Sequence, residues 1–192
     1  MNSDRLEAFS DGVLAIIITI MVLEIKPPEE ATFASLSGVL PIFLSYLVSF
    51  IYLGIYWNNH HHLMQVVEKV DGKVLWANLH LLFWLSLVPF VTNWAGENHL
   101  QAIPIACYGA VLLMSAVAYR LLEIFLLRQD MGNHRLKQAI NTGLKENVST
   151  FLYVAALPLA FVNSWISVAI YIAVAVIWFM PDRRVEKAIR QQ

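Results

Sequence analysis

The stretch that decides the fold is residues 5–24, which read RLEAFSDGVLAIIITIMVLE. Charged residues open the stretch, and the apolar run that follows approaches the roughly 20 residues a helix needs to cross a hydrocarbon core. Asp11 lies at the mouth of this run, where a carboxylate is costly and requires a partner. The stretch therefore predicts a membrane-spanning helix that carries a polar group at its beginning.

Five further apolar stretches follow the first, so the sequence predicts six transmembrane helices. We place them at about residues 9–25, 36–57, 75–95, 102–127, 147–163 and 165–180. The composition agrees, because 58% of the 192 residues are hydrophobic, whereas a soluble domain has about 45–50%. The mean hydropathy is +0.60. No linker or low-complexity tract divides the chain, so we interpret residues 1–192 as one domain of an all-α membrane protein.

The distribution of basic residues predicts the side of the membrane that each connection faces. If the sides alternate from the N-terminus, the N-terminal side holds eleven of the thirteen Lys and Arg residues, and the opposite side holds only Lys26. The eleven are Arg5, Lys69, Lys73, Arg128, Arg135, Lys137, Lys145, Arg183, Arg184, Lys187 and Arg190. Because basic loops stay in the cytoplasm, we expect both termini and the polar connection Asn58–Lys73 to be cytoplasmic.

Composition and motifs exclude several classes of function. The net charge of −1 gives no basis for binding nucleic acid. Cys107 is the single cysteine, so no intrachain disulfide forms, and no Cys/His spacing is typical of zinc. Ser10 and Asp11 point about 100° apart on a helix, which is a poor base for a catalytic triad. Since recognised catalytic motifs are also missing from the sequence, we predict no enzyme activity, no cofactor and no metal.

A helical wheel separates the apolar and polar faces of the first span. With about 100° between neighbours, one stripe of the helix carries Phe9, Gly12, Ile16, Thr19, Ile20 and Leu23. Asp11 lies about 140° from Ile16, on the back of the helix. The stripe and the carboxylate therefore face different neighbours. Taken alone, such a stripe is typical of packing against lipid or a protein core.

Asp11 is expected to meet hydrogen-bond donors at the same depth in the membrane. The candidates at the inner ends of the second and third spans are Asn58, Asn59, His60, His61, His62, Asn78 and His80. We predict that Asp11 is structural and holds the first helix by charge-assisted hydrogen bonds to donors of this group. The three consecutive histidines are poorly arranged for a metal, because neighbours about 100° apart cannot all face one ion.

An ion pair is predicted inside the fourth span. Arg120 is the one basic residue that falls within an apolar stretch, and Glu123 lies three residues further along. Residues at this spacing share a helix face, so each is expected to neutralise the other. The pair is placed near the inner interface, where a long side chain extends its charge toward water.

The opening of the first span resembles the signature of a known family. Arg5, Phe9, Ser10 and Asp11 form an Arg-x-x-x-Phe-Ser-Asp motif at the start of the first of six spans. The motif and the six-span pattern along the whole chain are similar to the transmembrane-protein-175 family, potassium channels known from lysosomes and prokaryotes. The Thr-Val-Gly-Tyr-Gly filter loop of ordinary potassium channels is absent from the sequence.

The resemblance implies a homotetramer in the prokaryotic inner membrane, with the first helix of each six-helix subunit around a central pore. The family's pore-lining positions map onto Ile16, Thr19, Ile20 and Leu23. Ile16 would form the constriction. The family's buried polar network maps onto Arg5, Ser10 and Asp11, with a histidine or asparagine partner for which His80 is our candidate. The implied function is a potassium-selective channel that passes monovalent cations.

A proton-coupled secondary transporter is the alternative hypothesis. Asp11 and His80 would relay protons, and Pro89 and Pro158 would break helices at mid-membrane. However, the two prolines fall in the third and fifth spans, which do not correspond between two three-helix halves. A transporter saturates with substrate and turns over slowly, whereas a channel passes resolvable unitary currents.

Overall fold

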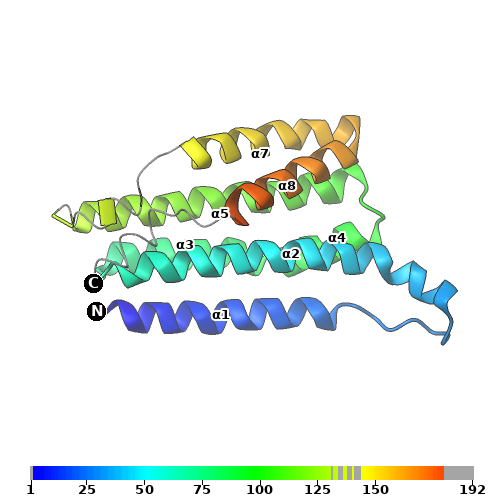
Figure 1. The fold of residues 1–192 in the computed structure, drawn as a ribbon, viewed down its shortest axis with the longest axis horizontal. Coiled ribbons are helices and arrows are strands. Elements are labelled where there is room, and N and C mark those ends of the chain that lie inside the picture. Colours follow the sequence, from blue (N-terminus) through cyan, green and yellow to red (C-terminus); the bar gives the residue numbers. More distant parts are fainter. Residues whose placement is uncertain (1, 131, 134–135, 138–139, 141–143, 180–192) are drawn as a thin grey trace.

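The computed structural model describes residues 2–130, 132–133, 136–137, 140 and 144–179, and these residues are predominantly helical (Figure 1). The named helices within these ranges are α1 (Ser3–Leu23), α2 (Phe33–Gln65), α3 (Gly72–Ser86), α4 (Val88–Glu97), α5 (Ala102–Gln129), α7 (Leu144–Val162) and α8 (Ser164–Phe179). Apart from an isolated bridge between Asn2 and Lys69, the described residues form no extended pairing.

Most of these helices are long and apolar enough to cross a membrane. By length and composition, α1, α2, the α3–α4 pair and α5 qualify, and α8 is a shorter apolar helix. α7 is 19 residues long and covers the fifth predicted span. Over the described residues, each of the six predicted spans therefore coincides with a helix or a helix pair, and the chain is a multi-pass membrane protein whose described residues are predominantly helical.

The third span consists of two helices rather than one. α3 ends at Ser86, and Leu87 is both its C-cap and the N-cap of α4. Pro89 follows in the first turn of α4, where its missing N–H needs no partner. The predicted break at Pro89 is therefore confirmed, whereas Pro158 lies inside α7 without ending it.

The expected loop from Asn58 to Lys73 is wrong over its first half, because α2 continues to Gln65. The Asn59 side chain donates a hydrogen bond to the carbonyl of Ile55, 2.8 Å away in the preceding turn. His60 is buried, with 2% of its surface exposed. A hydropathy pattern detects only the apolar part of α2. The helix continues past that part to Gln65, because the polar side chains of its last turns pack on neighbouring helices.

The helices lie side by side along one axis, with α1 at an edge of the bundle (Figure 1). α5 packs against α3 and α7, α7 packs against α8, and α2 packs against α4. α1 contacts α2, α3 and α4. It therefore presents one flank to the protein and leaves the other uncovered.

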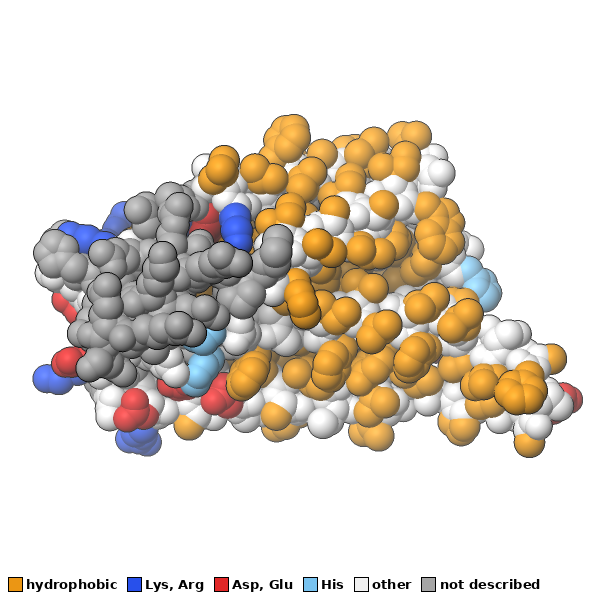
Figure 2. Space-filling view, in the orientation of Figure 1, with side chains coloured by type: hydrophobic (Ala, Val, Ile, Leu, Met, Phe, Trp, Pro, Cys, Tyr) orange, Lys and Arg blue, Asp and Glu red, His pale blue; other side chains and the backbone are white. Residues whose placement is uncertain are grey.

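The two ends of the bundle differ in charge. At one end the Ser3 N–H donates to the Glu68 carbonyl at 3.3 Å, and the Gln129 side chain donates to the Lys69 carbonyl at 2.7 Å. This basic end carries Arg5, Lys69, Lys73, Arg128, Lys137 and Lys145, and the other five basic residues assigned to it lie outside the described residues. Between the ends, hydrophobic side chains cover the visible face (Figure 2).

Candidate functional site

α1 has a packed face and an exposed face. The packed face consists of Ser3, Leu6, Ser10, Leu14, Ile17 and Met21. The exposed face carries the stripe from the helical wheel, Phe9, Gly12, Ile16, Thr19, Ile20 and Leu23. Ile16 is 59% exposed and Leu23 is 79% exposed, whereas Met21 is 3% exposed. The rest of the subunit therefore does not cover the stripe, which is free to face another subunit, lipid or water.

Thr19 places an oxygen acceptor on the exposed face. Its hydroxyl donates to the helix backbone, with Oγ1 2.9 Å from the Ile16 carbonyl and 3.0 Å from the Ala15 carbonyl. A hydroxyl has one hydrogen and two lone pairs. Because its hydrogen is occupied by the backbone, the oxygen presents lone pairs outward, one turn away from Ile16.

A buried hydrogen-bonded chain joins α1 to α3 and α2. Ser10 Oγ donates to the Leu6 carbonyl at 2.9 Å and accepts from Asn78 Nδ2 at 2.9 Å. Asn78 Oδ1 is then the acceptor toward His60, so Nε2 of the ring donates to it across 2.8 Å. Ser10 and Asn78 are fully buried. Paired polar groups in a core specify one packing arrangement, so this chain fixes the rotation of α1.

Two carboxylates of α1 contact α2 near its basic end. Trp57 Nε1 donates to Asp11 Oδ1 at 3.0 Å. Glu7 Oε1 lies 2.6 Å from His61 Nδ1, and the Trp57 and His61 rings are stacked. The donor for Asp11 is therefore an indole, which was not among the amide and imidazole groups considered from sequence, although Trp57 is adjacent to them in the chain.

His80 and Arg5 lie apart from these contacts. His80 Nε2 accepts from Trp84 Nε1 at 3.0 Å, one turn along its own helix. Arg5 is exposed and forms no hydrogen bond or ion pair with the described residues. Within one subunit the structure thus places Ser10 with Asn78 and His60. It places Asp11 with Trp57, and it brings neither His80 nor Arg5 to that network.

A groove of about 500 Å³ runs beside the exposed stripe. Ile16 and Ile20 of α1 form one wall, and Pro89 and Phe90 of α4 form the other. Phe90 is 63% exposed. This groove continues the uncovered apolar surface of α1 onto α4.

Comparisons with known proteins identify the family. Residues 5–89 match the sequence model described as endosomal/lysosomal potassium channel TMEM175. The chain is 54% identical over 191 residues to a potassium channel of Chryseobacterium sp. (strain P1-3), covering 100% of both. It is 33% identical over 190 residues to a potassium channel of Chamaesiphon minutus, covering 91% of this chain and 92% of the relative.

A solved structure shows the same fold. It is described as the crystal structure of a lysosomal potassium-selective channel TMEM175 homolog from Chamaesiphon minutus. The TM-score is 0.80 at 30% identity, over 92% of this chain and 95% of that one. These relatives are channels rather than enzymes. By its identity to full-length relatives and by its fold, the chain belongs to the TMEM175 potassium channel family.

Proposed function

We propose that the chain is the subunit of a homotetrameric potassium channel in a prokaryotic inner membrane, with α1 of each subunit lining the pore. Relatives aligned along nearly the whole chain are named potassium channels, which supports K⁺ as the permeant ion. The observation that carries the pore assignment is the exposed stripe of α1 opposite a packed face. Residues 1–192 form a single channel domain, K⁺ is the permeant ion, and conduction requires no cofactor.

Ile16 forms the constriction in this proposal. Four branched apolar side chains around an axis offer no oxygen to replace the water around an ion, so a narrow ring resists wetting and raises the barrier for every ion. Thr19, one turn away, offers its oxygen to a partly dehydrated ion. Because K⁺ is less strongly hydrated than Na⁺, this order of residues favours K⁺. Ile20 and Leu23 extend the wall toward the outer mouth.

The charges at the two ends support a direction for the pore. The positive-inside rule places the basic end in the cytoplasm and the end of α1 at Glu24 outside. Glu24, Glu29 and Glu30 are exposed there, and Asn93 Nδ2 lies 3.5 Å from Glu24 Oε2. Carboxylates at a pore mouth raise the local concentration of cations, so the outer mouth would attract K⁺.

The groove beside α1 supports assembly into a ring. Phe90 and Pro89 of α4 lie next to the stripe and leave apolar surface uncovered within one subunit. In a tetramer the neighbouring subunit would pack against the Pro89 and Phe90 wall of this groove, while the stripe turns to the axis. A transporter that relays protons from Asp11 to His80 is less well supported, because His80 is bonded within its own helix.

Reconstitution into liposomes tests the proposal. Under a potassium gradient the protein should pass unitary currents whose flux does not saturate as a carrier's would. Ile16→Phe should reduce the current by narrowing the constriction. Val22→Phe makes a similar change at an exposed position of α1 outside the stripe and should leave the current unchanged. Equal loss of current in both variants would count against the pore assignment, and saturable flux without unitary events would favour a transporter.

A further inference from the structure

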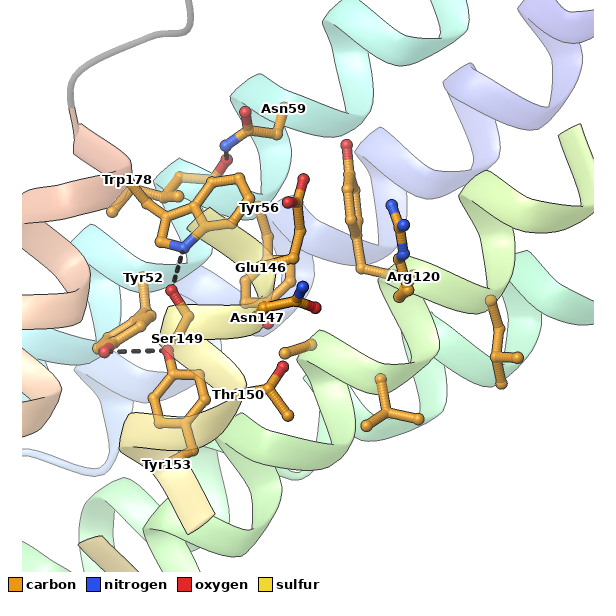
Figure 3. A pocket seen from close by; sticks show the side chains of 15 residues that line it. Tyr52, Tyr56, Asn59, Arg120, Glu146, Asn147, Ser149, Thr150, Tyr153 and Trp178 are labelled. Atoms are coloured by element: carbon orange, nitrogen blue, oxygen red, sulfur yellow. Dashed lines mark hydrogen bonds between the residues drawn. The ribbon is translucent and has the colours of Figure 1, made fainter. Parts of the chain in front are cut away.

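A cavity of about 260 Å³ lies among α2, α5, α7 and α8, and none of its lining residues belongs to α1 (Figure 3). Aromatic side chains form much of its wall, namely Tyr52, Tyr56, Tyr119, Tyr153 and Trp178. Glu146 enters from the first turn of α7, and Trp178 from the last turn of α8. Both turns face the basic end, so the cavity lies where the apolar band meets the polar end of the molecule.

The charges inside this cavity are unequal. Arg120 Nη1 donates to Glu123 Oε2 at 3.1 Å, which confirms the predicted pair and neutralises one cation with one carboxylate. Glu146 has no such partner among the described residues, and its Oε2 atom is buried without a hydrogen bond. A buried carboxylate oxygen that lacks a donor is unfavourable. Oε2 of Glu146 therefore lacks a hydrogen-bond donor, and a cationic group of a ligand would supply one.

The aromatic wall suits the same kind of group. The faces of Trp and Tyr rings attract an ammonium ion electrostatically. Trp178 Nε1 donates to Ser149 Oγ at 2.8 Å, so its N–H is turned away from Glu146 and its ring is held in place (Figure 3). A primary ammonium can both lie against these rings and donate to Glu146, whereas a quaternary ammonium has no N–H to donate.

Arg120 indicates that the ligand also carries a negative charge. In Figure 3 Glu146 lies between Trp178 and Arg120. The Arg120 side chain is 41% exposed, and a guanidinium has five N–H donors, so donors remain after the bond to Glu123. Such a fork matches a phosphate group. A carboxylate and a guanidinium that line the same cavity complement a ligand that carries an ammonium and a phosphate.

We propose that this cavity binds the headgroup of an ethanolamine phospholipid, with its ammonium on Glu146 and its phosphate on Arg120. A lipid is favoured over a free solute because Ile55, Val117 and Leu121 also line the cavity. Phe151 and Val154 on the adjacent surface of α7 are exposed and would lie along the acyl chains. The lipid would fix α7 and α8 against α5 at the cytoplasmic interface, away from the permeation path.

Lipid titrations on the purified full-length protein in detergent test this proposal. Native mass spectrometry and thermal melting should show an ethanolamine phospholipid binding about tenfold or more tightly than a choline or glycerol phospholipid with the same chains, because only the first supplies an N–H donor and a phosphate together. Equal binding of the three lipids would overturn the proposal. So would equally tight binding of soluble phosphoethanolamine, which would assign the cavity to a free solute.

Two variants locate the binding. Glu146→Gln should weaken binding of the ethanolamine phospholipid by about tenfold or more. Without lipid it should keep or raise the melting temperature, because it replaces a carboxylate whose Oε2 atom is buried without a hydrogen bond. Glu68→Gln removes the same charge from an exposed site at the same end, outside the cavity, and should leave binding unchanged. Wild-type affinity in a folded Glu146→Gln protein would overturn the assignment.

Discussion

Asn78 stands at the centre of the contacts that hold α1, because it donates to Ser10 and accepts from His60. Asn78→Ala should lower the free energy of unfolding by roughly 2–6 kcal/mol, since Ser10 and His60 each lose a partner and each loss costs about 1–3 kcal/mol. Asn93→Ala is the matched control, because the only hydrogen-bond partner of Asn93 among the described residues is Glu24, at 3.5 Å. Thermal melting of the detergent-solubilised protein measures the stability of both variants. Equal losses of stability would contradict the central role of Asn78 in holding α1.

Asp11 is predicted to act with Trp57 as a pair, because the indole N–H donates to its carboxylate. Asp11→Ala and Trp57→Phe should each lower the stability of the protein and the yield of the proposed tetramer. The double variant should be less destabilised than the sum of the two, with a coupling of about 1 kcal/mol. This double-mutant cycle is measured by the melting temperatures of the wild type, the two single variants and the double variant. Strictly additive losses would show that Asp11 depends on some other donor.

Part of this residue-scale arrangement could be predicted from sequence. Asp11 needed a donor at the inner end of the second or third span, and Trp57 lies at that depth. The indole was missed because the candidates were limited to amides and imidazoles. The identity of the histidine bonded to Asn78 depends on how α2 and α3 pack. Depth alone therefore could not distinguish His60 from His80.

At the scale of the helix, α1 is predicted to expose Leu23 to the pore and to bury Met21. In a Cys107→Ser background, Leu23→Cys should react with a water-soluble thiol reagent and lose current, because Leu23 is 79% exposed on the stripe. Met21→Cys should be protected, because Met21 is 3% exposed. Accessibility is measured as the rate of current loss after reagent is added from the outer side. Similar rates at both positions would disprove the orientation of α1.

Gly109 on α5 allows the close approach of Tyr171 on α8. A Cβ at position 109 would clash with Tyr171 Oη, and that hydroxyl donates to the Ile105 carbonyl at 3.2 Å. Gly109→Ala should therefore lower the free energy of unfolding by about 1–3 kcal/mol. Gly38→Ala has nothing within 4 Å and should be neutral or stabilising by up to about 1 kcal/mol. Thermal unfolding compares them, and a harmless Gly109→Ala would contradict this packing.

Helix existence was easier to predict than helix ends. The apolar runs located every span, because the membrane imposes a minimum length on each one. The start of α1 at Ser3 depends on the Asn2 cap, and the extension of α2 to Gln65 depends on polar side chains that pack on other helices. Hydropathy measures neither of these local contacts.

At the scale of the whole molecule, the family and the fold follow from the sequence, whereas the pore does not. The Arg-x-x-x-Phe-Ser-Asp motif and six spans indicated the family, and full-length relatives and a solved fold confirm it. In the proposed tetramer the pore axis lies between subunits, so no contact within one chain defines it. Within a single subunit, the exposure of Ile16 is the feature from which we infer the pore of the assembled channel.

The reversal potential under bi-ionic potassium and sodium, measured for the wild type and Ile16→Asn with matched protein amounts, tests the pore most directly. An amide at position 16 would wet the constriction, so Ile16→Asn should raise conductance and shift the reversal potential toward equal permeability. The wild type should prefer potassium. If Ile16→Asn leaves both the conductance and the reversal potential unchanged, Ile16 does not face the permeation path and the proposed pore is wrong.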